Sequence, residues 1–452
     1  MHTFVNILIA LLMLSVIIII HEFGHFIFAR INGVTVNDFS LGLGPVIFSK
    51  KIGQTKFSLR AFPIGGSCMM KGDDGQGAGD DEDSFASKKL WQRFSIVLAG
   101  PVFNFILAFV LSLVIIGWGG YDPAYIAGVS KDADIKDSDG EAYEPKKGDL
   151  ITEIDGKNVV IGRDFTMYTY FHEIDEDELS LKIKRDGKEK KYTVTPIAVS
   201  KYYMGISYSA DDLPAQVTVI KGNPAEKAGL RDGDTITAIN GTEIKSGLEL
   251  QDYMAEHPLD GSELTLTYVR GTKPHDLTFK SEYTTNYSLG FSANTYREKA
   301  NALQTIRYSF TEVRFWIDNT IHSLFYMATG HVHKEDVGGA VRITKEISDV
   351  VEESKQDGTK YVILNLLFMC VLISANLGVM NLLPIPALDG GRLLFMLIEL
   401  IRGKPLPPEK EAIVHLIGFA LLMVLMVFIL YNDIRNVFFV MLPKLSNIFG
   451  FL

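Results

Sequence analysis

The strongest constraint on the fold is a set of four long apolar runs, which lie in two pairs toward the ends of a chain of 452 residues. A helix of about 20 apolar residues spans a hydrocarbon core of about 30 Å. The runs predict transmembrane helices at residues 1–30, 94–118, 361–386 and 412–431. A cleaved signal peptide is the alternative for the first run, but no Lys or Arg precedes its apolar core. We therefore expect a multi-pass α-helical membrane protein.

Basic residues beside the apolar runs predict their orientation. A series of Lys and Arg from Lys50 to Arg93 separates the first two runs, whereas residues 1–20 contain none. Because loops rich in Lys and Arg stay in the cytoplasm, we expect this segment inside the cell and the N-terminus outside. Alternation of the four spans then places the polar middle of the chain outside.

Composition removes some classes of function. The net charge is −10, and no basic block resembles a nucleic-acid patch, so we expect no nucleic-acid partner. The chain has two cysteines, Cys68 and Cys370, which cannot form a disulfide framework for a protein of this size. The lipid bilayer is the partner that the composition does predict.

The polar middle contains an internal repeat. Residues 146–159 and 231–244 share the frame G-D-x-I-x-x-I-[DN]-G, with aliphatic residues at strand spacing and Asp-Gly or Asn-Gly turns. The frame resembles PDZ domains, above all in the second copy, which AEKAGL precedes. We expect two extracytoplasmic β-rich PDZ-like domains, at residues 121–199 and 213–290. The resemblance implies that they bind peptide ends at a sheet edge, and a size filter is the open alternative.

The flanking segments have patterns of their own. Apolar and polar residues alternate in the first part of residues 31–93, which predicts membrane-associated β-hairpins followed by an acidic mobile loop. Residues 300–360 carry apolar residues at helical spacing and predict amphipathic interfacial helices. His331 and His333 lack a third ligand nearby, so we expect a solvated turn there.

The first span ends in H-E-x-x-H, formed by His21, Glu22 and His25. On a helix, positions i and i+4 share one face, so both imidazoles can reach one metal ion. Two imidazoles without a nearby cysteine suit Zn²⁺, and the glutamate is placed to take a proton from water. The alternative is a pair of satisfied histidines at a helix end. Ionisable groups at membrane depth favour the zinc site.

A third ligand is missing from the first span. Asp38 follows it but lies near the expected membrane surface. Asp389 of NLLPIPALDGGRL is the better candidate, because two prolines end the third span just before it. An Asp that caps the next helix is the alternative reading.

These motifs together resemble the bacterial site-2 proteases, the RseP-type intramembrane zinc metalloproteases, over nearly the whole chain. HEFGH, FSLGLGP, FPIGGSCMMKG, LWQRFSIVLAGPVFNF and NLLPIPALDGGRL carry the resemblance. It implies that His21, His25 and Asp389 bind Zn²⁺ and that Glu22 is the general base. One departure is GGAVRI at residues 338–343, where the family has G-P-V-G-I.

The same resemblance implies how substrate is held. Asn376 and Asn381 are implicated in substrate binding, and we count Pro384 and Pro386 of the same motif with them. The expected substrates are single-pass transmembrane proteins, such as anti-sigma factors or signal-peptide remnants, cut within the bilayer after another protease has trimmed them. The expected location is the bacterial inner membrane, with the active site toward the cytoplasmic side.

Two other functions remain as alternatives. A non-catalytic scaffold could combine peptide-binding PDZ-like domains with a structural metal, but a structural zinc has a closed shell of four ligands and no need of Glu22. A metal transporter would need further intramembrane carboxylates as a relay.

Overall fold

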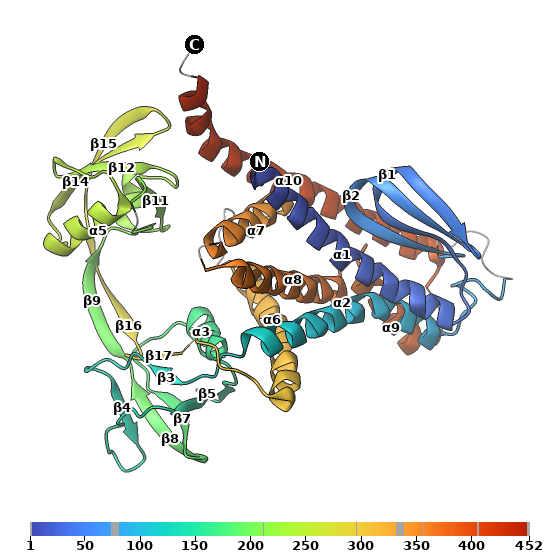
Figure 1. Cartoon of the computed structure of the whole chain (residues 1–452), viewed down its shortest axis with the longest axis horizontal. Helices are drawn as coiled ribbons and strands as arrows, with labels where there is room; N and C mark the ends of the chain where they lie inside the picture. Colours follow the sequence, from blue (N-terminus) through green and yellow to red (C-terminus); the bar gives the residue numbers. More distant parts are fainter. Residues whose placement is uncertain are drawn as a thin grey trace. The chain divides into compact units, whose positions relative to one another are not determined.

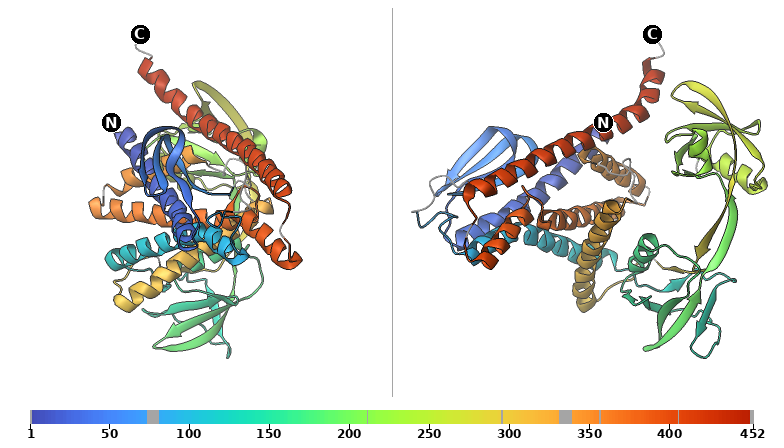
Figure 2. Two further views of the ribbon diagram at one scale, coloured as in Figure 1. Left: turned by 90° about the vertical axis from the view of Figure 1, so that its right-hand side faces the viewer. Right: turned by 180° about the vertical axis from the view of Figure 1, so that it is seen from behind.

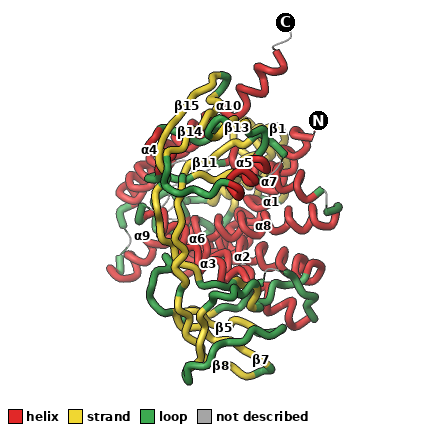
Figure 3. Tube along the Cα trace, turned by 90° about the vertical axis from the view of Figure 1, so that its left-hand side faces the viewer, coloured by secondary structure: helices red, strands yellow, loops and turns green. Residues whose placement is uncertain are grey.

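The computed structural model describes residues 2–73, 81–210, 212–294, 296–330, 339–355, 357–404 and 406–449. Two compact units divide the chain. The first comprises Met1–Pro123, Val160–Met167 and Thr295–Asp433, and the second comprises Ala124–Val159, Tyr168–Asn294 and Ile434–Leu452. Figure 3 shows the contrast between the helical part and the β-rich part of the chain.

Four helices of the first unit are long and apolar enough to cross a membrane, as the sequence predicts. They are α1 (His2–Ile31), α2 (Leu90–Gly119), α8 (Thr359–Leu382) and α10 (Pro408–Phe449). We compared how much of the most apolar 18-residue stretch of each helix is buried. The buried share is 33% in the first span, 44% in the second and 33% in the third, but 6% in the fourth. The first three therefore form the core, whereas α10 lies at the periphery, nearest the viewer in the right-hand view of Figure 2.

Small residues let α1, α2 and α8 approach closely (Figure 1). A Cβ added to Gly24 of α1 would lie 2.4 Å from the carbonyl oxygen of Ala99 in α2. A Cβ on Gly378 of α8 would lie 2.7 Å from the ring of Phe105 in α2. Without a hydrophobic driving force between helices in lipid, such close packing is what holds them together.

The expected β-hairpin follows α1 and consists of β1 (Val36–Ile52) and β2 (Thr55–Met70). The first half of β1 pairs on both sides with β2, because β2 bends back: Phe39 is opposite both Cys68 and Phe57. Large apolar side chains of this hairpin are exposed, which is typical of a surface in contact with lipid. They are Leu43, Val46, Ile47, Phe48 and Phe62.

Shorter helices complete the first unit: α6 (Ala302–Ala328), α7 (Ala340–Ser354) and α9 (Asp389–Arg402). The region that departs from the family pattern begins α7. Asp433 of α10 accepts hydrogen bonds from the backbone N–H groups of Gly339, at 3.1 Å, and Arg342, at 3.3 Å. A carboxylate at a helix N-terminus satisfies donors that the helix itself leaves unpaired.

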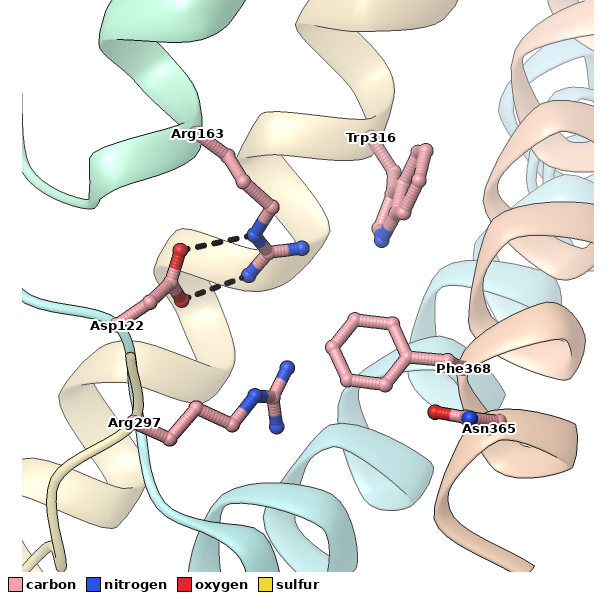
Figure 4. A pocket seen from close by; sticks show the side chains of 6 residues that line it. All are labelled: Asp122, Arg163, Arg297, Trp316, Asn365 and Phe368. Carbon is pink, nitrogen blue, oxygen red and sulfur yellow. Dashed lines mark hydrogen bonds and ion pairs between the residues drawn. The ribbon is translucent and has the colours of Figure 1, made fainter. Parts of the chain in front are cut away.

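Arg163 joins three segments of the first unit that are distant in sequence. It pairs with Asp122, after the second span, at 2.9 Å and with Glu312 of α6 at 2.6 Å. Burial opposes its charge, but the two carboxylates outweigh burial and raise the pKa of Arg163. Figure 4 shows the pocket of about 310 Å³ beside it, lined by Asp122, Arg163, Arg297, Trp316, Asn365 and Phe368.

The second unit is rich in strands. Two series of elements repeat one order, and the first series includes a helix, the start of which belongs to the first unit. The first series is β5 (Leu150–Ile154), β6 (Lys157–Asn158), α3 (Gly162–Phe171), β7 (Leu179–Arg185) and β8 (Lys188–Thr195). The second is β12 (Thr235–Ile239), β13 (Thr242–Glu243), α5 (Gly247–Glu256), β14 (Glu263–Arg270) and β15 (Lys273–Lys280). Both series have a register shift at the same place, between Ile151 and Glu153 and between Ile236 and Ala238. The sequence repeat is thus a structural repeat.

Further strands extend the two sheets, whose orders are β4-β8-β7-β5-β6 and β10-β11-β12-β14-β15 with β13 on β12. The added elements are β4 (Asp134–Asp137), β10 (Ile206–Tyr208), β11 (Ala215–Val219) and the short helix α4 (Pro224–Ala228). β9 (Ile197–Tyr203) pairs with β16 (Glu282–Ser288), and β3 (Ile126–Ala127) pairs with β17 (Ser292–Ala293).

Turn chemistry explains why the repeats fold alike. Asp155 and Asn240 have positive φ, of 45° and 46°, and each precedes a glycine that also has positive φ. This is the pattern of the two-residue hairpin turns that Asp-Gly and Asn-Gly predict. Equivalent ion pairs, Arg185 with Asp149 and Arg270 with Asp234, brace the first strand of each series.

Candidate metal centre

Three side chains from two distant parts of the chain converge in the first unit. Nε2 of His21 lies 3.1 Å and Nε2 of His25 lies 3.4 Å from Oδ2 of Asp389. The two Nε2 atoms are 3.2 Å apart. Both histidines are 7% exposed. The structure therefore brings together the three residues that the sequence analysis proposed as ligands.

Helix α2 fixes the orientation of His25. Nδ1 of His25 is 2.9 Å from the carbonyl oxygen of Ile96. Because a carbonyl only accepts, the proton must be on Nδ1, and Nε2 keeps its lone pair for a metal. The close approach of the two helices depends on Gly100, where an added Cβ would lie 2.3 Å from Nε2 of His25.

Helix α2 also supports His21, through Asn104. The Asn104 side chain is 0% exposed, and its Nδ2 lies 3.2 Å from Nδ1 of His21. Its Oδ1 has no hydrogen-bond partner among the described residues. A half-turn of the amide would let Oδ1 accept the proton that a metal-binding His21 carries on Nδ1.

Asp389 is placed by a tight loop between α8 and α9. It is the first residue of α9, and Leu388 is the N-cap. The two glycines that follow allow the backbone of α9 to pack against this loop. A Cβ added to Gly390 would lie 2.1 Å from the carbonyl oxygen of Leu383, and a Cβ added to Gly391 would lie 2.5 Å from that of Ile385. The aspartate thus both begins the helix and faces the histidines.

The donor set fits Zn²⁺. Oδ2 of Asp389 is buried and has no hydrogen-bond partner among the described residues. With protons on both Nδ1 atoms, the two Nε2 lone pairs and this carboxylate face one another. Three acceptors so close together repel one another unless a cation lies between them. Within the described ranges, no fourth Cys, His, Asp or Glu joins the three. Three protein ligands with an open position are typical of catalytic rather than structural zinc.

The rejected candidate Asp38 has other partners. It pairs with Arg60 at 2.9 Å and accepts a hydrogen bond from Ser58 at 2.7 Å. His331 and His333 lie outside the described residues.

Glu22 lies between the helices and the hairpin. It is half-buried beside the two histidines on α1, and the main chain at Cys68 of β2 hydrogen-bonds to its carboxyl group. A Cβ added at Gly66 would lie 2.9 Å from Cγ of Glu22. The last part of β2 therefore runs directly past the proposed base.

The four expected substrate residues have different surroundings. Nδ2 of Asn381 is 3.5 Å from both ring nitrogens of His21. Asn376 accepts a hydrogen bond from the hydroxyl of Thr320 in α6. In the connecting loop Pro384 is exposed and Pro386 is half-buried. Their role in substrate binding stays a prediction.

Sequence reasoning missed two supporting residues, Gly100 and Asn104. Both lie in GPVFNF of the second span, and their spacing of four places them on one helix face. A polar amide at that position of an apolar span was the available signal.

The family model described as Peptidase family M50 matches residues 9–425. The zinc metalloprotease RasP of Shouchella clausii is 29% identical over 444 residues, which is 94% of this chain and 97% of that protein. The zinc metalloprotease RasP of Bacillus licheniformis is 29% identical over 446 residues, 95% of this chain and 98% of that protein. A solved PDZ domain of HtrA3, bound to a phage-derived ligand, aligns with a TM-score of 0.17 and 22% identity over 20% of this chain and 93% of its own.

Proposed function

We propose a mechanism for this chain, which belongs to peptidase family M50 and is a zinc-dependent intramembrane endopeptidase. In the proposal, His21, His25 and Asp389 hold the zinc ion and Glu22 is the general base. The observation that carries it is the convergence of two Nε2 atoms and a buried carboxylate oxygen within 4.8 Å of one another.

When bound, zinc supplies a Lewis acid that polarises the scissile carbonyl and activates water. Glu22 takes the proton of the attacking water and later gives it to the nitrogen of the leaving amine. The Ile96 carbonyl and Asn104 keep the two imidazoles in the required tautomer. A substrate carbonyl would enter on the open side, past Asn381.

Amide side chains near the centre suit a helical substrate. A transmembrane helix satisfies its peptide groups internally, so the enzyme must offer replacement partners while the helix unwinds. Asn381 can donate and accept at once. Asn376 could accept a hydrogen bond from the substrate through Oδ1 only by giving up the hydrogen bond that Thr320 donates to it. Pro384 and Pro386 would line the same entrance.

The edge of β2 at residues 66–70 offers a second support. These residues pair with β1 on one side, and Gly66 packs beside Glu22. A substrate segment that becomes extended can add a strand at such an edge. This would bring its scissile bond to the base.

The substrates we propose are single-pass transmembrane proteins that another protease has already shortened, such as anti-sigma factors or signal-peptide remnants. The PDZ-like β-rich halves would face outside the bacterial cell membrane and select the shortened chains. The basic loop between the first two spans would lie in the cytoplasm, with the active site toward that side.

The test is Glu22→Gln, assayed with a transmembrane substrate in proteoliposomes and by zinc content. We expect cleavage to be lost while zinc stays bound, and exposed Glu82→Gln to behave as wild type. Cleavage at the wild-type rate by Glu22→Gln would refute the role of the base. Asp389→Ala is expected to lose zinc, and full zinc content in that variant would refute the ligand set.

A further inference from the structure

The last transmembrane helix contacts the loop that carries the third metal ligand. Nδ1 of His415 in α10 accepts a hydrogen bond from the backbone N–H of Ala387, at 2.8 Å. Beside it, a Cβ added to Gly418 would lie 2.4 Å from Pro386, so the helix and the loop are in close contact there. Only 6% of the apolar stretch of α10 is buried, so the helix meets the rest of the unit at few places, and this contact is one of them.

Ala387 needs such a partner. Its φ is +79°, a left-handed conformation that a residue with a Cβ rarely adopts. Holding a non-glycine residue in this region is energetically costly, and the surrounding structure has to compensate. The hydrogen bond to His415 falls on the N–H of the strained residue itself.

The His415 ring is held by its Nδ1 atom and by one packing contact. Because Nδ1 accepts, the ring proton must be on Nε2, which has no hydrogen-bond partner among the described residues; Oε1 of Glu411, one turn earlier in α10, is 3.8 Å from it. The ring also packs edge-on against Phe395 of α9, with centroids 5.3 Å apart. A fixed ring gives the acceptor a fixed position.

We propose that His415 is a positioning residue of the metal centre: through Ala387 it sets the direction in which Asp389, two residues later, presents its carboxylate. Asp389 is the first residue of α9, so its orientation follows the preceding turn. The inference rests on the proposed role of Asp389 as a ligand. Nothing in the motif NLLPIPALDGGRL itself points to a residue of the fourth span.

The experiment measures zinc affinity by competition with a chelator, in the full chain purified in detergent. His415→Leu replaces the imidazole by an apolar side chain of similar size and removes the acceptor. We expect zinc affinity to fall by about 10- to 100-fold, as for other residues that orient a metal ligand. His415→Asn places Oδ1 close to the former Nδ1, and we expect its affinity within about 3-fold of wild type. Leu416→Ala, at an exposed neighbour, is the matched control.

A second change tests the strain directly. Ala387→Gly removes the cost of positive φ, so combined with His415→Leu it should recover much of the lost affinity. The absorption spectrum of the Co²⁺-substituted protein reports the ligand geometry independently of cleavage, and it should shift in His415→Leu and return in the double variant. If His415→Leu does not fold, the zinc affinities of His415→Asn and Ala387→Gly still test the proposal. Loss of affinity in His415→Asn would overturn the proposal.

The two proposals fail in different ways. If Asp389→Ala binds zinc as tightly as wild type, Asp389 is not a ligand and the proposed ligand set is refuted. If Asp389→Ala loses zinc but His415→Leu keeps wild-type affinity and an unchanged Co²⁺ spectrum, only the role of His415 is overturned.

Discussion

Gly100 lies so close to His25 that a Cβ at Gly100 would be 2.3 Å from Nε2, the atom that faces Asp389. Gly100→Ala must therefore displace the imidazole or separate α1 from α2. We expect zinc affinity to fall by more than about 100-fold, because a ligand itself moves rather than its support. Zinc content after dialysis against a chelator measures this.

Gly117→Ala in the same helix is the control. Its added Cβ would meet Thr305 at 3.8 Å, an ordinary contact. Since alanine has a higher helix propensity than glycine, we expect this variant to be as stable as wild type or more so. Equal zinc loss in both variants would mean that Gly100 matters only through the stability of α2.

Asn104 should control the tautomer of His21. Asn104→Leu removes the acceptor for Nδ1–H, and we expect zinc affinity to fall by about 10- to 100-fold. Asn104→Asp retains an acceptor oxygen at the same place and should bind zinc more tightly than the leucine variant. Isothermal titration with zinc can rank the three proteins. Equal affinities in the leucine and aspartate variants would contradict the assignment.

Arg163 should be needed for the stability of the first unit. The side chains of Asp122 and Glu312 are 4% and 3% exposed, so Arg163→Ala leaves two buried carboxylates without their cation. Breaking such a pair costs about 3–5 kcal/mol. We expect a clear fall in the thermal unfolding temperature, which static light scattering can follow.

We expect Arg163→Lys to lower the thermal unfolding temperature as well. The single ammonium of lysine cannot form the forked contacts that Arg163 makes with both carboxylates. Arg307→Ala, at an exposed position of α6, the helix that carries Glu312, controls for loss of a positive charge. A wild-type unfolding temperature for Arg163→Lys would show that charge alone is sufficient.

Local sequence patterns predict much of this architecture. Apolar runs predict the four spans because lipid forces every peptide group into a helix, and H-E-x-x-H specifies two ligands and a base on one turn. Asp389 could be predicted only because it follows the prolines that end the third span and because the zinc site in the first span lacked a third ligand.

The supporting residues could not be predicted from the sequence, for a physical reason. Gly100, Asn104 and His415 act through contacts with distant segments of the chain. Their partners, respectively His25, His21 and Ala387, depend on how the helices pack. The departure at residues 338–343 has the same character: Asp433, more than 90 residues later, caps the helix that starts there. Sequence order gives no distance between such positions.

The β-rich unit should lose stability in acid through Asp149. Burial opposes ionisation of this carboxyl group, but Arg185, Tyr143 and the N–H of Lys146 outweigh burial and lower its pKa from 3.8 to about 2. Because the folded pKa is the lower one, the ionised group stabilises the fold above pH about 4, and this contribution of about 2 kcal/mol is lost as the pH falls through about 2. Asp149→Asn should remove the same amount at neutral pH.

Hydrogen exchange of the β5 and β7 amides in the full chain measures the loss. At pH 7 we expect Asp149→Asn to exchange ~30-fold faster than wild type, since each 1.4 kcal/mol is about a factor of ten. The difference should shrink as the pH approaches about 2, where the wild-type carboxyl also takes up a proton. Exposed Glu176→Gln controls for the lost charge and should leave exchange unchanged. A difference between Asp149→Asn and wild type that persists undiminished at pH 2 would show that the side-chain shape, and not its charge, supports the strand.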